Sequence, residues 1–268
     1  MTASVGRIEL EIDEAVLAVA RAYAAAHGTT VEALMAGALR TMGADVMAAR
    51  LPLGSSRPFI TMFAHKGRDT TAHFLANGAW DDFEQPMPSF FYSWARSHPG
   101  VIVDGGANTG FYALLSAAAS DRNHVLAFEP DPTIRGLLQA NIDANEMAGR
   151  IVAIAPALSA QNGRAALYIP PQDHGVIETS SSLDSRFKSR FSEILEVETV
   201  TVDHAVQSMA PTGQPVSIIK IDVAGHEVAV LSGATQTVAE HRPVIFAEVL
   251  DRSDCGALSA FIARHGYL

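Results

Sequence analysis

From Gly100 onward the sequence alternates short apolar runs with stretches that favour helices, and this alternation constrains the fold more than any other feature. We predict strands at residues 101–104, 124–129, 151–156, 216–223 and 244–250, with helices that end near Ala119, Glu146, Glu240 and His265. Such alternation is typical of an α/β fold, a doubly wound and mainly parallel sheet with helices on both faces. Ligands of these sheets bind outside the carboxyl ends of the strands, so we expect the functional residues there.

The composition excludes several classes of protein. The chain has 268 residues, 48% of them hydrophobic and 18% charged, which is enough for a substantial core. Its net charge of −10 has the wrong sign for binding nucleic acid or an anionic membrane. No apolar run approaches the ~18 to 20 residues of a membrane span. The single cysteine, Cys255, and an N-terminus unlike a signal peptide predict a cytoplasmic protein.

The segment Val101-Ile-Val-Asp-Gly-Gly-Ala-Asn-Thr-Gly110 predicts a ligand-binding turn after the first strand of this sheet. The candidate cofactor-binding residues in it are Asp104, Gly105, Gly106, Ala107, Asn108, Thr109 and Gly110. Their small side chains allow a tight turn and a close approach of the backbone to a ligand. The pattern is G-x-N-x-G, which differs from the G-x-G-x-x-G of dinucleotide-binding enzymes, although Asn108 also tolerates positive φ.

A second acid follows the next strand, in Phe128-Glu-Pro130. Glu129 can accept hydrogen bonds from both hydroxyls of a ribose. Asp104 favours a ligand with a cationic amino-acid part and would repel a pyrophosphate, so S-adenosylmethionine is the predicted cofactor. We expect the two carboxylates to face a common cavity, with the adenine near Ala157 and Ser159. A nicotinamide-dependent oxidoreductase is an alternative.

Three motifs resemble the FkbM-type S-adenosylmethionine-dependent methyltransferases. They are Val103-Asp-Gly-Gly-Ala-Asn-Thr-Gly-Phe-Tyr112, Phe128-Glu-Pro130 and Ile219-Lys-Ile-Asp-Val-Ala-Gly-His-Glu227. Ser181-Ser-Leu183 and Arg242-Pro-Val-Ile-Phe-Ala-Glu248 fit the same family. The resemblance implies a Rossmann-like class I methyltransferase fold and, usually, O-methylation of a hydroxyl on a sugar, polyketide or related metabolite.

Two features depart from this family's pattern. Ala224 stands where the family usually has an acid. The fold class also implies two strands after the last helix, whereas this sequence ends at Leu268, so we expect a sheet that is truncated or completed by a partner.

Four residues are candidates for acid–base chemistry: Asp222, His226, Glu227 and Glu248. Asp222 follows the fourth strand and is the first choice by position, although capping of the next turn is an alternative. His226 titrates in a range suited to a base. Glu227 could orient either neighbour or sit at a helix N-terminus, and Glu248 could face the substrate or form a structural salt bridge.

Residues before the sheet form a separate pattern. A strand at 7–12, a helix after Asp13 and a second helix from Thr29 resemble the ribbon-helix-helix module. Its outward strand positions carry Glu9 and Glu11, which would repel DNA, so we predict homodimerisation through this module. A helical hairpin packed on its own catalytic domain and a DNA-binding regulator with a methyltransferase-like sensor domain are the alternatives. The predicted domains are the strand-helix-helix module at 1–50, a linker with short strands at 51–77, and the methyltransferase domain at 78–268.

The connection from Pro170 to Arg190 is long and polar, which is typical of a lid. Within it, Arg186, Lys188 and Arg190 could contact an acidic acceptor, although a solvated face also explains them. The scattered histidines and the single cysteine do not match known metal-ligand spacings.

Overall fold

The computed structural model describes residues 14–26, 30–31, 48–50, 60–63, 69, 71–72, 83–171, 180–251 and 253–267. The chain divides into two compact units, Met1–Val46 and Met47–Leu268. The first unit contains helix α1 (Glu14–Ala26), where the sequence predicts a helix after Asp13. The strand predicted at 7–12 and all but two residues of the second predicted helix lie outside the described residues, so the ribbon-helix-helix resemblance has no support from the structure.

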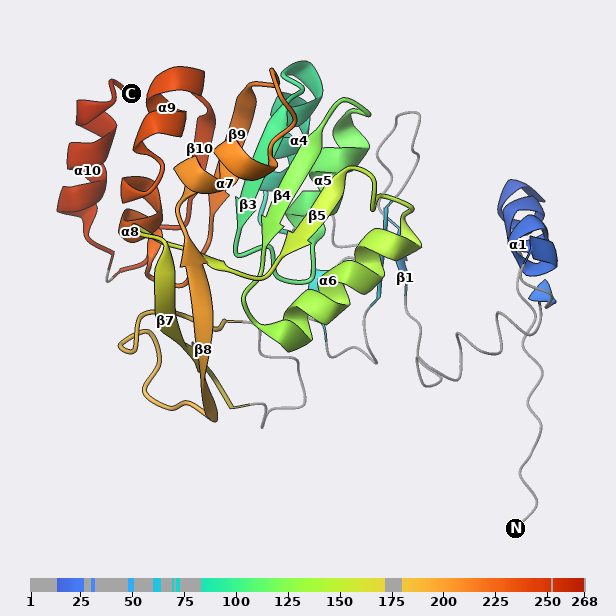
Figure 1. Ribbon diagram of the computed structural model, residues 1–268, viewed down its shortest axis with the longest axis horizontal. Helices are drawn as coiled ribbons and strands as arrows, with labels where there is room; N and C mark the ends of the chain where they lie inside the picture. Colours follow the sequence, from blue (N-terminus) through green and yellow to red (C-terminus); the bar gives the residue numbers. More distant parts are fainter. Residues whose placement is uncertain are drawn as a thin grey trace, which may run out of the picture. The chain divides into compact units, whose positions relative to one another are not determined.

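The second unit contains a parallel sheet of five strands (Figure 1). They are β3 (Val101–Gly105), β4 (His124–Phe128), β5 (Ile151–Ile154), β9 (Val216–Ile221) and β10 (Val244–Ala247). Their order is β10-β9-β3-β4-β5, and each neighbouring pair is parallel. The chain proceeds outward from β3 in one direction through β4 and β5, and returns on the other side as β9 and β10. The predicted doubly wound α/β fold is therefore confirmed, and the carboxyl ends of β3 and β9 meet at its switch point.

Helices cover both faces of this sheet. One face packs against α4 (Met87–Ser97), α5 (Phe111–Ala119) and α6 (Pro132–Ala144). The other packs against α7 (Val202–Met209), α8 (Glu227–Ser232), α9 (Thr235–His241) and α10 (Cys255–Arg264). The alternation within β3 explains this, because Ile102 joins the first core while Val101 and Val103 join the second. All three side chains are fully buried, as expected for a central parallel strand.

A smaller sheet of three strands follows β5. It comprises β6 (Ala157–Leu158), β7 (Gly163–Ile169) and β8 (Glu193–Val200), in the order β6-β8-β7. Neither β7 nor helix α7 was predicted from the sequence. A separate antiparallel pair joins β1 (Ala48–Arg50) to β2 (Thr61–Phe63). The division at Val46 therefore places β1 in the second unit, although the predicted module extended to residue 50.

Local sequence signals explain several helix ends. Asp131 caps α6 by accepting hydrogen bonds from the amides of Thr133 and Ile134, and Pro132 occupies the first helical position. The single helix predicted up to Glu240 is instead two helices, α8 and α9, which are separated near Gly233. A Cβ on Gly233 would lie 2.3 Å from the carbonyl oxygen of Ser159, so the chain passes too close there for any other residue.

Within the described ranges, none of the helices is long and apolar enough to cross a membrane.

Candidate functional site

The turn between β3 and α5 packs tightly against the neighbouring elements. Gly106 has a φ of +72°, and a Cβ on it would lie 1.8 Å from the carbonyl oxygen of Asp222. Gly110 has a φ of +103°, and its Cβ would lie 2.6 Å from Leu138 in α6. Asn108 also has a positive φ, at +54°, as its place in G-x-N-x-G predicts. The two glycines therefore hold the turn against β9 and α6, and the turn presents its backbone at the edge of the sheet.

Glu129, directly after β4, is held in place by this turn. One carboxylate oxygen accepts the amide of Asn108 at 3.0 Å, and the other accepts the amide of Asp131 at 3.0 Å. The side chain is 5% exposed, and burial raises the pKa of Glu129 to about 7. Each carboxylate oxygen has a further lone pair, so Glu129 can accept additional hydrogen bonds from a ligand.

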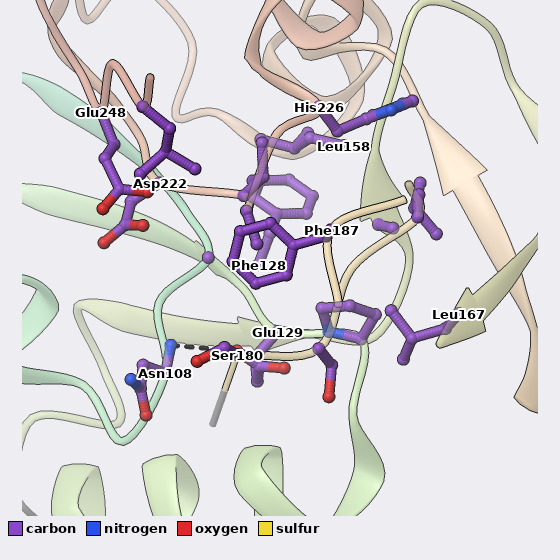
Figure 2. Close-up of a pocket in the computed structure, with 18 residues that line it drawn as sticks. Asn108, Phe128, Glu129, Leu158, Leu167, Ser180, Phe187, Asp222, His226 and Glu248 are labelled. Carbon is purple, nitrogen blue, oxygen red and sulfur yellow. Dashed lines mark hydrogen bonds between the residues drawn. The ribbon is translucent and has the colours of Figure 1, made fainter. Parts of the chain in front are cut away.

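A cavity of about 230 Å³ lies at the carboxyl edge of the sheet (Figure 2). Four of the predicted cofactor-binding residues line it: Gly106, Asn108, Glu129 and Ala157. The other six, Asp104, Gly105, Ala107, Thr109, Gly110 and Ser159, are not among the residues that line this cavity. Its walls are mixed, with apolar Phe128, Leu158 and Phe187 between polar ends. Such a cavity suits a small ligand that has an apolar middle and hydrogen-bonding groups at its ends.

Asp104 has a different environment from the one that the sequence predicts. Its side chain is fully buried, and its nearest cation is Lys220, whose Nζ lies 3.4 Å from Oδ1. Burial raises the pKa of Asp104, while the charge of Lys220 opposes this rise. Asp104 and Glu129 therefore do not face one common cavity: Glu129 lines it, and Asp104 forms a buried ion pair.

Lys220 is a site residue that sequence reasoning missed. Its Nζ also lies 3.5 Å from Asp222 and donates a hydrogen bond to the carbonyl of Gly106 at 3.2 Å. Burial lowers its pKa, but the carboxylates of Asp104 and Asp222 reverse this, so the pKa of Lys220 is raised. A lysine within the apolar run of β9 was the available signal, since a lysine is almost never fully buried without a partner.

Asp222 and Glu248 lie together at the ends of β9 and β10. Figure 2 shows their side chains on the same side of the cavity, and both line it. The amide of Glu248 donates to the carbonyl of Ile221 at 2.9 Å, which extends the pairing of these strands and brings the two side chains close. Burial, the negative charge of Asp222 and a hydrogen bond with it raise the pKa of Glu248 to about 7. This pair can therefore hold a proton near neutral pH, which suits acid–base chemistry.

His226 and Glu227 have different surroundings from Asp222 and Glu248. His226 lines the cavity on the opposite side from Asp222 and Glu248, and its Nε2 lies 2.9 Å from Oγ of Ser159. Burial lowers the pKa of His226, which favours the neutral imidazole. Glu227 is buried and accepts the amides of Val223 and Gly225. In this arrangement Glu227 holds the turn after β9 in shape.

The predicted lid contacts this same turn. Ser182 Oγ donates to the carbonyl of Ala224 at 2.7 Å, and Phe187 lines the cavity. Arg186 forms an ion pair with Asp184 within the loop, with Nη2 2.9 Å from Oδ2.

Among the described residues, no group of three or more histidine, cysteine, aspartate and glutamate side chains is arranged to hold a metal ion.

Comparisons with known proteins show which family the chain is similar to. The family model described as Methyltransferase FkbM domain matches residues 104–268. The chain is 25% identical over 158 residues to Methyltransferase sdnD of Sordaria araneosa, an alignment that covers 50% of this chain and 60% of the relative. It is 27% identical over 138 residues to the Hexuronic acid methyltransferase AglP of Haloferax volcanii, with 52% and 51% covered. The chain thus spans 51 to 60% of the length of these curated relatives.

Solved structures give weaker similarities. The Methyltransferase FkbM structure from Methylobacillus flagellatus KT matches with a TM-score of 0.43 and 18% identity, covering 73% of this chain and 48% of that chain. An O-methyltransferase from Bacillus cereus in complex with SAH matches with a TM-score of 0.40 and 15% identity, covering 74% of each chain. The family model spans more than half of the sequence, so the chain belongs to the Methyltransferase FkbM domain family.

Proposed function

We propose that the protein is an S-adenosylmethionine-dependent methyltransferase that methylates a hydroxyl of a small acceptor such as a sugar, a polyketide or a related metabolite. One observation carries this proposal: a single cavity has Glu129 of the β4 end and the Asp222–Glu248 pair of the β9 and β10 ends in its wall. Family membership and the printed names of both curated relatives, which are methyltransferases, support it.

The residues of this cavity fit the proposed cofactor. The buried carboxylate of Glu129 can accept both ribose hydroxyls, and the wall at Ala157 and Leu158 can cover an adenine. At the other end, Asp222 and Glu248 complement a positive charge. The turn at Gly106 and Asn108 can contact the methionine part. When bound, S-adenosylmethionine supplies a methyl group on a positively charged sulfur.

The Asp222–Glu248 pair provides the base for this reaction. With the cofactor bound, this pair would accept the proton of the acceptor hydroxyl while the hydroxyl oxygen receives the methyl group, and the cofactor would be left as a neutral thioether. A base in this position contributes on the order of 10²- to 10⁴-fold to the rate. Alignment of the hydroxyl with the methyl group contributes more, because the leaving group is already activated.

Calorimetry tests the proposed cofactor. S-Adenosylhomocysteine is expected to bind, and NAD is not, because the G-x-N-x-G turn and the acidic cavity disfavour a pyrophosphate. Binding of NAD without S-adenosylhomocysteine would support the oxidoreductase alternative and overturn the proposal. Asp222→Asn tests the base: transfer of labelled methyl groups to a metabolite pool at an undiminished rate would exclude Asp222 from this role.

We also propose that residues 1–50 form a dimerisation module before a methyltransferase domain at 78–268. Sedimentation of the full chain and of a chain that begins at Met47 tests this, with a dimer expected for the full chain alone. A gel shift with random duplex at low salt tests the DNA-binding alternative, and no shift is expected because Glu9 and Glu11 repel phosphates. A cytoplasmic location stays a prediction.

A further inference from the structure

Asp222 and Glu248 also line a second cavity, of about 540 Å³, on the side of the sheet that α4 and α5 cover. Its other walls include Glu84, just before α4, and Tyr112 in the first turn of α5. Met87 and Phe246 contribute apolar surface. Because the two carboxylates line both cavities, a ligand in one cavity and a ligand in the other can contact the same pair of side chains.

The charges of the second cavity are predominantly negative. Three carboxylates line it, those of Glu84, Asp222 and Glu248, against one ammonium, that of Lys220. Asp104, 3.4 Å from Lys220, already balances that ammonium, and Asp222 lies 3.5 Å from it. Even with a proton on the Asp222–Glu248 pair, the cavity keeps an excess of negative charge.

Glu84 is held at the cavity by Tyr112. The Tyr112 hydroxyl donates to Oε2 of Glu84 at 2.6 Å. Burial and the neighbouring carboxylates, first of all Glu84, raise the pKa of Tyr112, so its hydroxyl stays a neutral donor. Oε1 of Glu84 can accept hydrogen bonds from a ligand, and a carboxylate binds an ammonium or a hydroxyl donor more strongly than a neutral amide does.

Resting on the proposed function, we propose that the second cavity is the acceptor site, and that it selects hydroxylated acceptors with a positive charge or no charge, with Glu84 as the residue that sets this preference. The acceptor hydroxyl then lies beside the Asp222–Glu248 pair, where the two cavities adjoin, so that it can also reach the methyl group in the cofactor cavity. This selection differs from the acidic acceptor that the basic residues at 186–190 could contact. It also differs from the hexuronic acid in the printed name of one relative.

A labelling experiment tests the charge preference. A pool of small metabolites is separated by ion exchange at pH 7 into anionic, neutral and cationic fractions before the reaction. Each fraction is then incubated with the full-length protein and S-adenosylmethionine that carries a labelled methyl group. Label is expected in the neutral or cationic fraction. Label in the anionic fraction alone, or in no fraction while S-adenosylhomocysteine still binds, overturns the acceptor inference.

The same experiment separates this inference from the proposed function. Absence of both S-adenosylhomocysteine binding and labelling contradicts the methyltransferase proposal itself, and the acceptor inference then fails with it. Binding with labelling of the wrong fraction contradicts only the acceptor inference.

Substitution of Glu84 tests its role with the labelled acceptor. Glu84→Gln is expected to raise KM threefold to tenfold, because a charge-assisted hydrogen bond becomes a neutral one. The affinity for S-adenosylhomocysteine should stay within twofold. Tyr112→Phe releases Glu84 and should raise KM in the same direction with a smaller factor. Glu240→Gln on α9, exposed and outside both cavities, is the matched control and should change neither value.

The opposite pattern would overturn the inference. If Glu84→Gln weakens S-adenosylhomocysteine binding and leaves the acceptor KM unchanged, the second cavity holds part of the cofactor. Circular dichroism measures whether each variant is folded. If Glu84→Gln is unfolded, the KM of Tyr112→Phe for the acceptor tests the proposal instead. An unchanged KM for Tyr112→Phe would contradict it.

Discussion

Lys220 and Asp104 form an ion pair inside the protein, with Nζ 3.4 Å from Oδ1 and both side chains cut off from solvent. The pair joins neighbouring strands, since Lys220 lies on β9 and Asp104 on β3, and their backbones are paired in register. Lys220 also approaches Asp222, so the pair connects the core of the sheet to the proposed base. Removing one partner of such a buried ion pair destabilises a protein more than replacing both partners with apolar residues.

Lys220→Met should therefore destabilise the protein by about 3 to 5 kcal/mol, because it leaves a buried carboxylate without a partner. The double variant Asp104→Asn with Lys220→Met should recover part of this loss. Chemical denaturation at pH 7 measures both values. Arg164→Met, which breaks the exposed pair with Glu196, is the control, with an expected loss below about 1 kcal/mol. Equal losses for Arg164→Met and Lys220→Met would contradict this account of the pair.

The pKa of Glu248, raised to about 7, predicts the pH dependence of methyl transfer. The base must be unprotonated to accept the hydroxyl proton, so kcat should fall as the pH drops below about 7. Glu248→Gln removes this titrating group, and its kcat should no longer show a step at that pH. Measuring kcat from pH 5.5 to 8.5 at saturating substrates checks this. A wild-type profile that is flat across pH 7 would exclude Glu248 from the proton transfer.

Glu129 predicts a release of protons on cofactor binding. Its pKa is raised to about 7 without a ligand, and hydroxyl donors from a ribose would favour the ionised carboxylate and lower this pKa. Binding of S-adenosylhomocysteine should therefore release protons near pH 6.5 and tighten as the pH rises from 6 to 8. Calorimetry in buffers of different ionisation enthalpy measures the release.

Glu248 titrates in the same range, so a variant is needed to separate the two groups. Glu129→Gln should weaken binding and reduce the proton release, while Glu248→Gln should leave the contribution of Glu129 in place. If Glu129→Gln releases as many protons as the wild type, Glu129 does not contact the ligand through its carboxylate.

The parallel strands and the position of the candidate site could be predicted from the sequence because they depend on local patterns. Strands of five or six mainly apolar residues, such as β3 and β9, are recognised as buried parallel strands, and G-x-N-x-G and Phe128-Glu-Pro130 mark the ends of β3 and β4. Asp222 and Glu248 were found in the same way, as acids directly after β9 and β10. Their nearness to each other follows from the parallel pairing of those strands.

The direction of side chains could not be predicted in this way. Asp104 was expected at the cavity, but it points to Lys220, because the charges on β3 and β9 pair across the sheet. Glu227 was a candidate for proton transfer, but it bonds the amides of its own turn. Strand β7 also escaped detection, since the first four of its seven residues are exposed or only partly buried and show little alternation.

Gly106 offers a test of the turn after β3, which lines the first cavity. In Gly106→Ala the new Cβ would lie 1.8 Å from the carbonyl oxygen of Asp222, so the turn must move away from β9. The loss of stability should be about 3 kcal/mol or more, from overpacking and from the unfavourable positive φ together. Gly213→Ala is a matched control, because Gly213 has a similar φ of +79° with no atom within 4 Å of the new Cβ.

This control should lose only about 1 to 2 kcal/mol, the cost of the backbone conformation alone. Thermal denaturation of the two variants measures the difference. The displaced turn should also separate Asn108 from Glu129, so Gly106→Ala should weaken S-adenosylhomocysteine binding at least tenfold, while Gly213→Ala should leave it unchanged. If the two variants had equal stability and equal affinity for S-adenosylhomocysteine, the close approach of Gly106 to the carbonyl oxygen of Asp222 would not constrain the turn. That result would contradict this account of the turn.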